Sequence, residues 1–182
     1  GQSQKNIEVE PGHGLYLDYE ASGEEVARRE RAIRLGLGIE AKSNLLYRFC
    51  IQPLASEIEE IQRIVVENGI QFIVVDSAGP ACGGEPEAAG EALRYFAALR
   101  ALRVTSLTVA HVAKHGGKDT TPFGSVFWLN IARNVYEVKK VQEAEEDKFE
   151  VGLFHRKCNT GKLLRPRGFK LNFGEDETIR FS

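Results

Sequence analysis

Short, unbroken hydrophobic runs alternate along this chain with longer amphipathic stretches. The central run, residues 71–77 (QFIVVDS), has four apolar residues in a row that lead directly into one carboxylate, Asp76. Such a β-branched and aromatic run is typical of a strand that is covered on both faces, in the middle of a parallel sheet. Similar runs at 14–19, 45–51 and 104–109 predict three further strands.

Stretches with helical spacing separate these strands and predict helices at 22–35, 53–67 and 86–102. The segment that follows Asp76, SAGPACGGEPE, is rich in small residues and is predicted to be a loop that a ligand can approach closely. A short helix is expected within 123–131, followed by strands at 133–141, 148–157, 165–173 and 178–181. This order favours an α/β fold, with a mainly parallel central sheet extended by C-terminal antiparallel strands.

Polar side chains follow three of the predicted parallel strands at the point where each strand ends. Right-handed crossovers place Glu20, Asp76 and His111 at the carboxyl edge of the sheet, where open α/β sheets bind ligands. Two carboxylates and an imidazole can hold a metal ion, orient a water molecule and sense a phosphate. The alternative is that each of these residues caps a turn in solvent.

Composition narrows the function classes. The formal net charge is −2, so contact with nucleic acid requires a local basic patch. The segment 114–121 is one candidate, because it combines Lys114, His115 and Lys118 with two glycines. A second basic stretch, at 156–167, is either a solvated strand pair or a phosphate contact.

The chain contains no apolar run of the roughly 18 residues that a membrane span needs, which predicts a protein without membrane contact. Its cysteines, Cys50, Cys82 and Cys158, are far apart and odd in number. They fit neither a disulfide framework nor a zinc site, and they indicate a reducing, cytoplasmic interior.

Six ordered segments carry a resemblance to a known family: GLYLDYEAS, LLYRFCIQPL, QFIVVDSAGPACGG, LTVAHVAKHGG, GSVFWLNIAR and HRKCNTG. They resemble the RecA-like P-loop ATPases, and within that superfamily the RepA-like replicative helicases. The resemblance spans nearly the whole chain. It implies one RecA-like domain over 1–182, a three-layer sandwich that uses ATP and Mg²⁺.

The resemblance also implies roles for residues at the carboxyl edge. Asp76 matches the second acidic motif, which helps to hold Mg²⁺, and Ser77 lies beside it in the nucleotide site. Glu20 matches the carboxylate that polarises the attacking water. His111 matches the sensor next to the γ-phosphate.

Two further segments match parts that face other molecules. Arg133 matches an arginine finger that reaches the ATP of a neighbouring subunit, which implies a ring-shaped homo-oligomer; a surface arginine is the alternative. Lys157 matches a position near the same interface. Lys114, His115 and Lys118 match the loop that faces single-stranded DNA in the central channel.

One departure from the family pattern concerns the phosphate-binding loop. The motif G-x-x-x-x-G-K-[ST] does not occur in the 182 residues. In the family it lies on the strand and helix before the LYLDYE strand, so we expect either that this piece lies outside the printed sequence or that the chain is a truncated relative.

The predicted function is ATP hydrolysis in an oligomeric DNA helicase or DNA-dependent motor. The alternative is a non-catalytic RecA-like module that binds DNA or a partner.

Overall fold

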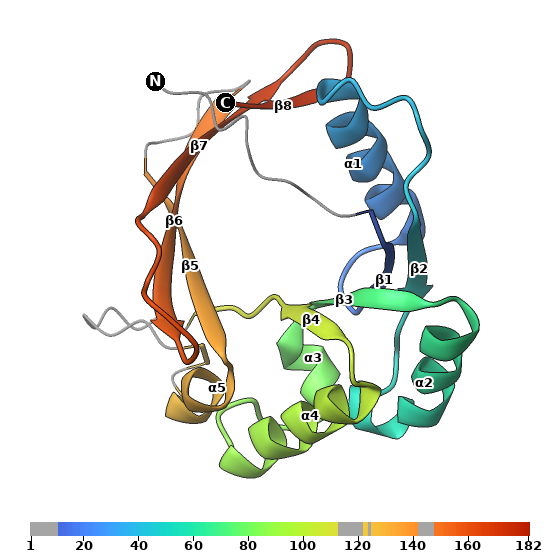
Figure 1. Ribbon diagram of the computed structural model, residues 1–182, viewed down its shortest axis with the longest axis vertical. Coiled ribbons are helices and arrows are strands. Elements are labelled where there is room, and N and C mark those ends of the chain that lie inside the picture. The colour runs from blue at the N-terminus through green and yellow to red at the C-terminus, as the bar shows by residue number, and fades with distance from the viewer. Residues whose placement is uncertain (1–10, 113–121, 124, 142–147) are drawn as a thin grey trace. The chain divides into compact units, whose positions relative to one another are not determined.

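The computed structural model describes residues 11–112, 122–123, 125–141 and 148–182 (Figure 1). The contacts within the chain divide it into two compact units. One unit comprises residues 10–23 and 43–131 and is called the parallel-sheet unit below. The other comprises residues 1–9, 24–42 and 132–182 and is called the antiparallel-sheet unit.

Four parallel strands form the sheet of the first unit, in the order β2-β1-β3-β4. Their bounds are β1 His13–Asp18, β2 Leu45–Phe49, β3 Ile70–Asp76 and β4 Thr105–Thr108. The register pairs Leu17 with Val75 and Asp18 with Asp76, so the first and third strands end at the same level. The carboxyl ends of both strands therefore lie at one edge of the sheet.

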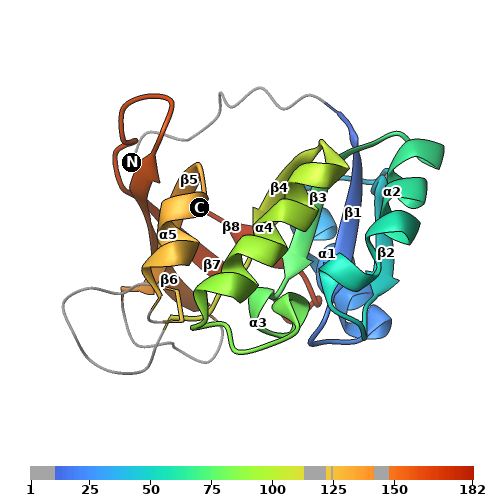
Figure 2. The same cartoon turned by 90° about the horizontal axis from the view of Figure 1, so that it is seen from below.

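Helices cover one face of this sheet, where α2, α3 and α4 lie together (Figures 1 and 2). The helical elements of the unit are η1 Leu54–Ser56, α2 Ile58–Glu67, α3 Ala78–Cys82, α4 Ala89–Leu102 and α5 Val126–Ile131. Alternate strand residues point into this layer: Leu15, Leu17, Ile73 and Val75 are at most 1% exposed. Because the site of Ile73 is closely packed, we expect its truncation to alanine to cost about 2–5 kcal/mol of stability.

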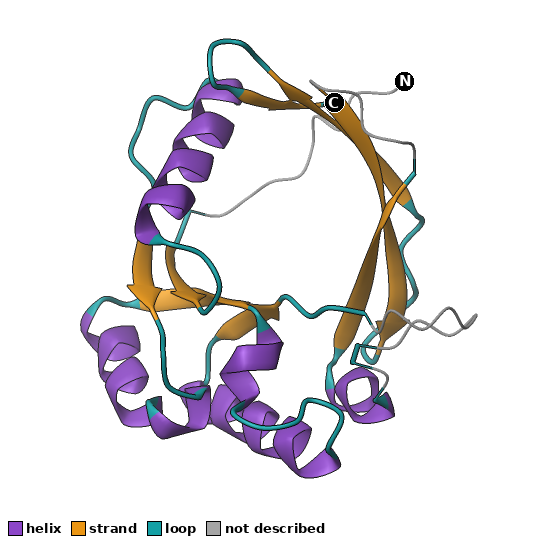
Figure 3. Cartoon of the chain, turned by 180° about the vertical axis from the view of Figure 1, so that it is seen from behind, coloured by secondary structure: helices purple, strands orange, loops and turns teal. Residues whose placement is uncertain are grey.

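The antiparallel-sheet unit contains strands in the order β5-β6-β7-β8. Figure 3 draws the strands of the chain in orange. Their bounds are β5 Asn134–Lys140, β6 Lys148–Cys158, β7 Arg167–Phe173 and β8 Ile179–Phe181. All but the first residue of α1 (Gly23–Gly36) belongs to this unit. A Cβ atom on Gly36 would lie 2.0 Å from the carbonyl oxygen of Ile179, so only glycine permits this close approach of α1 to β8.

The predicted α/β fold class is confirmed, and the antiparallel strands form a sheet of their own. Three local predictions were wrong. The segment after Asp76 contains the short helix α3, because Pro80 lies in its first turn, where the missing proline N–H costs nothing. The helix predicted from Pro53 is interrupted: a 3₁₀ turn, η1, precedes α2. The helix predicted from Pro86 begins at Ala89.

Candidate active site

The ends of β1, β3 and β4 are joined by backbone hydrogen bonds at the carboxyl edge of the parallel sheet. The N–H of Tyr19 donates to the carbonyl of Asp76 at 2.7 Å. The N–H of Ala78 donates to the carbonyl of Val109 at 2.8 Å. These bonds continue the sheet past the last strand residues. The side chains that follow, Glu20, Ser77 and His111, are thereby carried on a rigid edge.

Glu20 is the centre of the side-chain contacts at this edge. Its Oε1 atom accepts a hydrogen bond from the Ser77 hydroxyl and lies 3.2 Å from Nε2 of His111. The side chains of Glu20 and His111 are 41% and 67% exposed, so a solvent molecule or ligand can reach both. Among the described residues, the Oε2 atom of Glu20 has no hydrogen-bond partner. One carboxylate oxygen is therefore fixed and the other can accept a proton.

Among the described residues, the Asp76 carboxylate, like that of Glu20, has one oxygen with a hydrogen bond and one oxygen without. Its Oδ2 atom accepts a hydrogen bond from the Tyr16 hydroxyl, which comes from the neighbouring strand β1. Within the described part of the chain, Oδ1 has no partner. The peptide bond between Asp76 and Ser77 is cis.

Asp18, the last residue of β1, is a buried carboxylate that sequence reasoning missed. Its Oδ1 atom accepts the backbone N–H groups of Glu20 and Ala21, both at 2.9 Å. Its Oδ2 atom accepts the hydroxyl of Tyr47, from β2, at 3.0 Å. Desolvation raises the pKa of Tyr47, and the hydrogen bond to Asp18 raises it further. The signal in the sequence was the alternation LYLD, which puts Tyr16 and Asp18 on the face opposite Leu15 and Leu17.

A metal ion at this edge would rely mainly on Asp76. In the described ranges, no group of three or more His, Cys, Asp or Glu side chains has the arrangement of a metal cage. Mg²⁺ does not need such a cage, because proteins bind it through one or two carboxylates, with water and substrate phosphates completing the octahedron. The free Oδ1 of Asp76 is a hard oxygen ligand of this kind, so the residues present fit Mg²⁺.

The other predicted residues lie outside this group. Arg133, directly before β5, is exposed, and it belongs to the antiparallel-sheet unit. Its carbonyl accepts the N–H of Asn159 at 2.9 Å. The Lys157 ammonium group donates to the carbonyl of Ala132 at 2.6 Å, so Lys157 holds the chain next to Arg133. Lys114, His115 and Lys118 lie outside the described residues.

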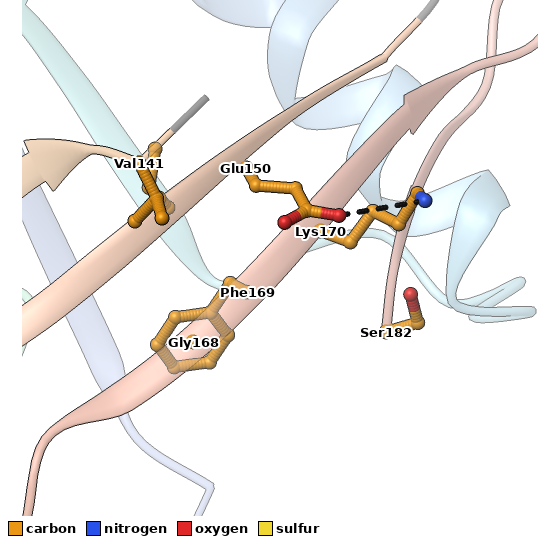
Figure 4. A pocket seen from close by; sticks show the side chains of 7 residues that line it. Val141, Glu150, Gly168, Phe169, Lys170 and Ser182 are labelled. Atoms are coloured by element: carbon orange, nitrogen blue, oxygen red, sulfur yellow. Dashed lines mark ion pairs between the residues drawn. The ribbon is translucent and has the colours of Figure 1, made fainter. Parts of the chain in front are cut away.

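A cavity of about 230 Å³ lies within the antiparallel-sheet unit (Figure 4). Its lining consists of Val141, Glu150, Val151, Gly168, Phe169, Lys170 and Ser182. The only charged side chains of this lining, Glu150 and Lys170, pair with each other at 3.5 Å. None of the predicted site residues lines this cavity, and its charges are already neutralised. The carboxyl edge of the parallel sheet is the better candidate for chemistry.

The fold defines the class of protein. A parallel sheet with a helical layer, together with antiparallel strands, is the RecA-like fold of the P-loop ATPases. A family model described as an AAA domain matches residues 1–117, and the chain belongs to this family. Among solved structures, the chain is similar to a KaiC-like protein from the hyperthermophilic archaeon Pyrococcus horikoshii OT3. The TM-score is 0.64 at 14% identity, over 94% of this chain and 76% of that one. A search of the curated proteins returned no match.

No described helix is both long enough and apolar enough to cross a bilayer.

Proposed function

We propose that this protein binds ATP with Mg²⁺ at the carboxyl edge of its parallel sheet and hydrolyses it. The main support for the proposal is the hydrogen bonding of the Glu20 carboxylate. Its Oε1 atom accepts the Ser77 hydroxyl and faces His111, while Oε2 has no hydrogen-bond partner among the described residues. A carboxylate at the end of a buried strand, fixed at one oxygen and open at the other, is suited to act as a general base.

In this mechanism Glu20 accepts the proton of the water that attacks the γ-phosphate. The Ser77 hydroxyl keeps the carboxylate in one orientation, so the proton acceptor is in place before the reaction begins. His111 lies 3.2 Å from Glu20 and, being mostly exposed, is placed to contact a phosphate oxygen. Asp76 would hold Mg²⁺ through its open oxygen; the ion would neutralise charge on the phosphates.

The finer proposal is an oligomeric DNA helicase or DNA-dependent motor of the RepA type. It is supported by the order of the sequence segments, by the exposed Arg133 and by the basic segment that holds Lys114, His115 and Lys118. In this proposal the protein is a ring-shaped homo-oligomer. Single-stranded DNA passes the basic segment, and Arg133 completes the ATP site of a neighbouring subunit.

The substitution Glu20→Gln in the native protein tests the proposed chemistry. The amide keeps the size of the side chain but cannot take up the proton of water, so ATP turnover should fall by ~10²–10⁴-fold while ATP binding persists. Glu24→Gln, in the first turn of α1, is the matched control and should leave turnover unchanged. Near wild-type hydrolysis by Glu20→Gln would remove the assigned role. A wild-type protein that binds a partner without turning over ATP would favour the non-catalytic alternative.

A further inference from the structure

Asp18 is a buried carboxylate with hydrogen-bond donors at both of its oxygens. It is 1% exposed, and burying a charge is costly unless donors replace the lost water. Three donors do so: the N–H groups of Glu20 and Ala21 at 2.9 Å, and the Tyr47 hydroxyl at 3.0 Å. An aspartate that binds backbone amides two and three residues ahead bends the chain into a tight turn. The turn begins at Asp18 and contains Glu20.

Hydrogen bonds from backbone N–H groups fix the chain on both sides of the Glu20 side chain. On one side, the N–H of Tyr19 donates to the Asp76 carbonyl at 2.7 Å. On the other side, Asp18 holds the N–H groups of Glu20 and of Ala21. The Glu20 side chain leaves this anchored segment and reaches Ser77 and His111. The position of its carboxylate therefore depends on the turn that Asp18 stabilises.

Tyr47 supports Asp18 from the adjacent strand β2. Its hydroxyl binds Oδ2, the oxygen that does not hold the backbone amides. Its ring also lies against Gly23, the first residue of α1: a Cβ atom on Gly23 would lie 3.0 Å from the Tyr47 ring. The tyrosine thus contacts both the carboxylate that begins the turn and the residue that begins the following helix.

We propose that Asp18, supported by Tyr47, is a positioning residue for the catalytic base Glu20. This inference rests on the proposed function. The turn sets the height of the Glu20 carboxylate above the sheet edge, where it meets Ser77 and His111. A displacement of about 1 Å at a catalytic group can cost on the order of 10²-fold in rate, so loss of this turn should lower turnover without removing the base.

Amide hydrogen exchange on the wild-type protein provides the first test. Exchange at Glu20 and Ala21 should be at least about tenfold slower than at unbonded loop amides, because both N–H groups are bonded to a buried acceptor. Free exchange at both amides would overturn the inference without any substitution. Asp18→Ala should abolish the protection, whereas Asp18→Asn should keep it, since the amide oxygen still accepts both N–H groups.

Steady-state kinetics of the same variants provide the second test. Asp18→Ala should lower kcat by about 10–100-fold with the KM for ATP within about twofold, and Asp18→Asn should restore kcat to within about threefold of wild type. Asp176→Ala is the matched control, because Asp176 holds the N–H and hydroxyl of Thr178 in a turn of the other unit. It should change neither exchange at Glu20 nor kcat.

Other outcomes separate this inference from the proposed function. If Asp18→Ala exposes the two amides but leaves kcat unchanged, the positioning role is overturned and the role of Glu20 stands. If Asp18→Asn is as inactive as Asp18→Ala, the charge rather than the turn matters, and the inference is overturned as well. If Glu20→Gln hydrolyses ATP normally, the catalytic role of Glu20 fails, while the exchange data still establish whether Asp18 anchors Glu20.

Discussion

The hydroxyl of Tyr16 donates a hydrogen bond to Oδ2 of Asp76 across the β1–β3 pair. The two side chains extend from the face of the sheet opposite the buried Leu15 and Val75. The bond occupies one oxygen of Asp76 and fixes the direction of the other. Tyr16, a residue within a strand, thereby orients the carboxylate that we expect to bind Mg²⁺.

Replacing Tyr16 with phenylalanine should weaken both the fold and the metal site. The lost bond involves a charged acceptor, so we expect a decrease of about 1.5–3 kcal/mol in the free energy of unfolding. ATP hydrolysis by the native protein should then require a higher Mg²⁺ concentration for half-maximal rate, because Asp76 is free to rotate. Urea unfolding and Mg²⁺ titrations of ATPase activity measure the two effects.

A double-mutant cycle separates the interaction energy of this pair from the other effects of each substitution. Tyr16→Phe and Asp76→Ala should show a coupling energy of about 0.5–3 kcal/mol, as contacting residues do. Tyr136→Phe is the control, because this exposed tyrosine stacks on His155 in the other unit. Additive effects of Tyr16→Phe and Asp76→Ala would show that the bond contributes nothing to stability.

The meeting of Glu20 and His111 at the candidate site was predictable from the sequence because two simple rules acted together. The unbroken run before Asp76 predicted a central strand covered on both faces. Ile73 and Val75 are fully buried, but Phe72 is 39% exposed, so the expected covering of both faces was wrong. Right-handed crossovers then predicted that Glu20 and His111 meet at one edge, and these residues lie 3.2 Å apart. Hydrophobic pattern and chain handedness are properties of whole elements, so they can be read without knowledge of individual contacts.

The hydrogen bonds that orient the site were not predictable in this way. Tyr16, Asp18 and Tyr47 lie inside strands, where their polar atoms depend on the register between β1, β2 and β3. The helix α3 was missed because its small residues have no amphipathic period. Ser77 precedes α3, yet its hydroxyl makes no helix-capping bond and donates to Glu20 instead. Whether such a side chain binds a local or a distant partner depends on the tertiary structure.

Stability should depend on pH through Glu25, in the first turn of α1. Arg28, at 2.9 Å, and Arg29, at 2.7 Å, lower the pKa of Glu25 from 4.5 to about 2. Because the pKa is lower in the folded state, ionised Glu25 stabilises the protein above pH 4.5, and this contribution is lost as the pH falls from there to about 2. Unfolding by urea, measured across this range, should vary less with pH in Glu25→Gln than in wild type.

The control for this prediction is Glu24→Gln, which neighbours Glu25 but has no ion pair in the described part of the chain. It should change the pH dependence less than Glu25→Gln does. Salt at about 1 M, where the Debye length is about 3 Å, should reduce the difference between wild type and Glu25→Gln. Identical pH profiles for wild type and Glu25→Gln would contradict the assigned ion pairs.

The basic segment 114–121 should contribute to binding of single-stranded DNA. Two lysines lie among glycines in a chain whose net charge is −2, so this segment concentrates positive charge. Lys114→Ala together with Lys118→Ala should weaken binding and lower the slope of log K against log salt by about 0.7 per lost phosphate contact. Lys139→Ala and Lys170→Ala, whose charges pair with Glu137 and Glu150, are the controls. An unchanged slope would count against the segment.

Arg133 should act on the ATP of a neighbouring subunit. Its backbone is held where Asn159 binds the Arg133 carbonyl and Lys157 binds the Ala132 carbonyl, while its side chain is exposed. No ion pair involves its guanidinium group within the described residues, so it can approach another charge. An arginine finger raises the rate of hydrolysis by ~10³–10⁵-fold, so Arg133→Ala should lower turnover by a similar factor. Arg156→Ala, which removes an arginine paired with Glu137, is the control.

Mixing two inactive variants determines whether Arg133 acts between subunits. An Arg133→Ala subunit still has Glu20, and a Glu20→Gln subunit still has Arg133. In randomly mixed equimolar rings, about a quarter of the interfaces combine an intact Glu20 with an intact Arg133 from the neighbour, so up to about that share of wild-type activity should return. If Arg133 served the site of its own subunit, every subunit would lack one of the two groups and no activity would return. Light scattering or native mass spectrometry must show that the variants co-assemble; co-assembly without recovered activity would exclude the role in trans.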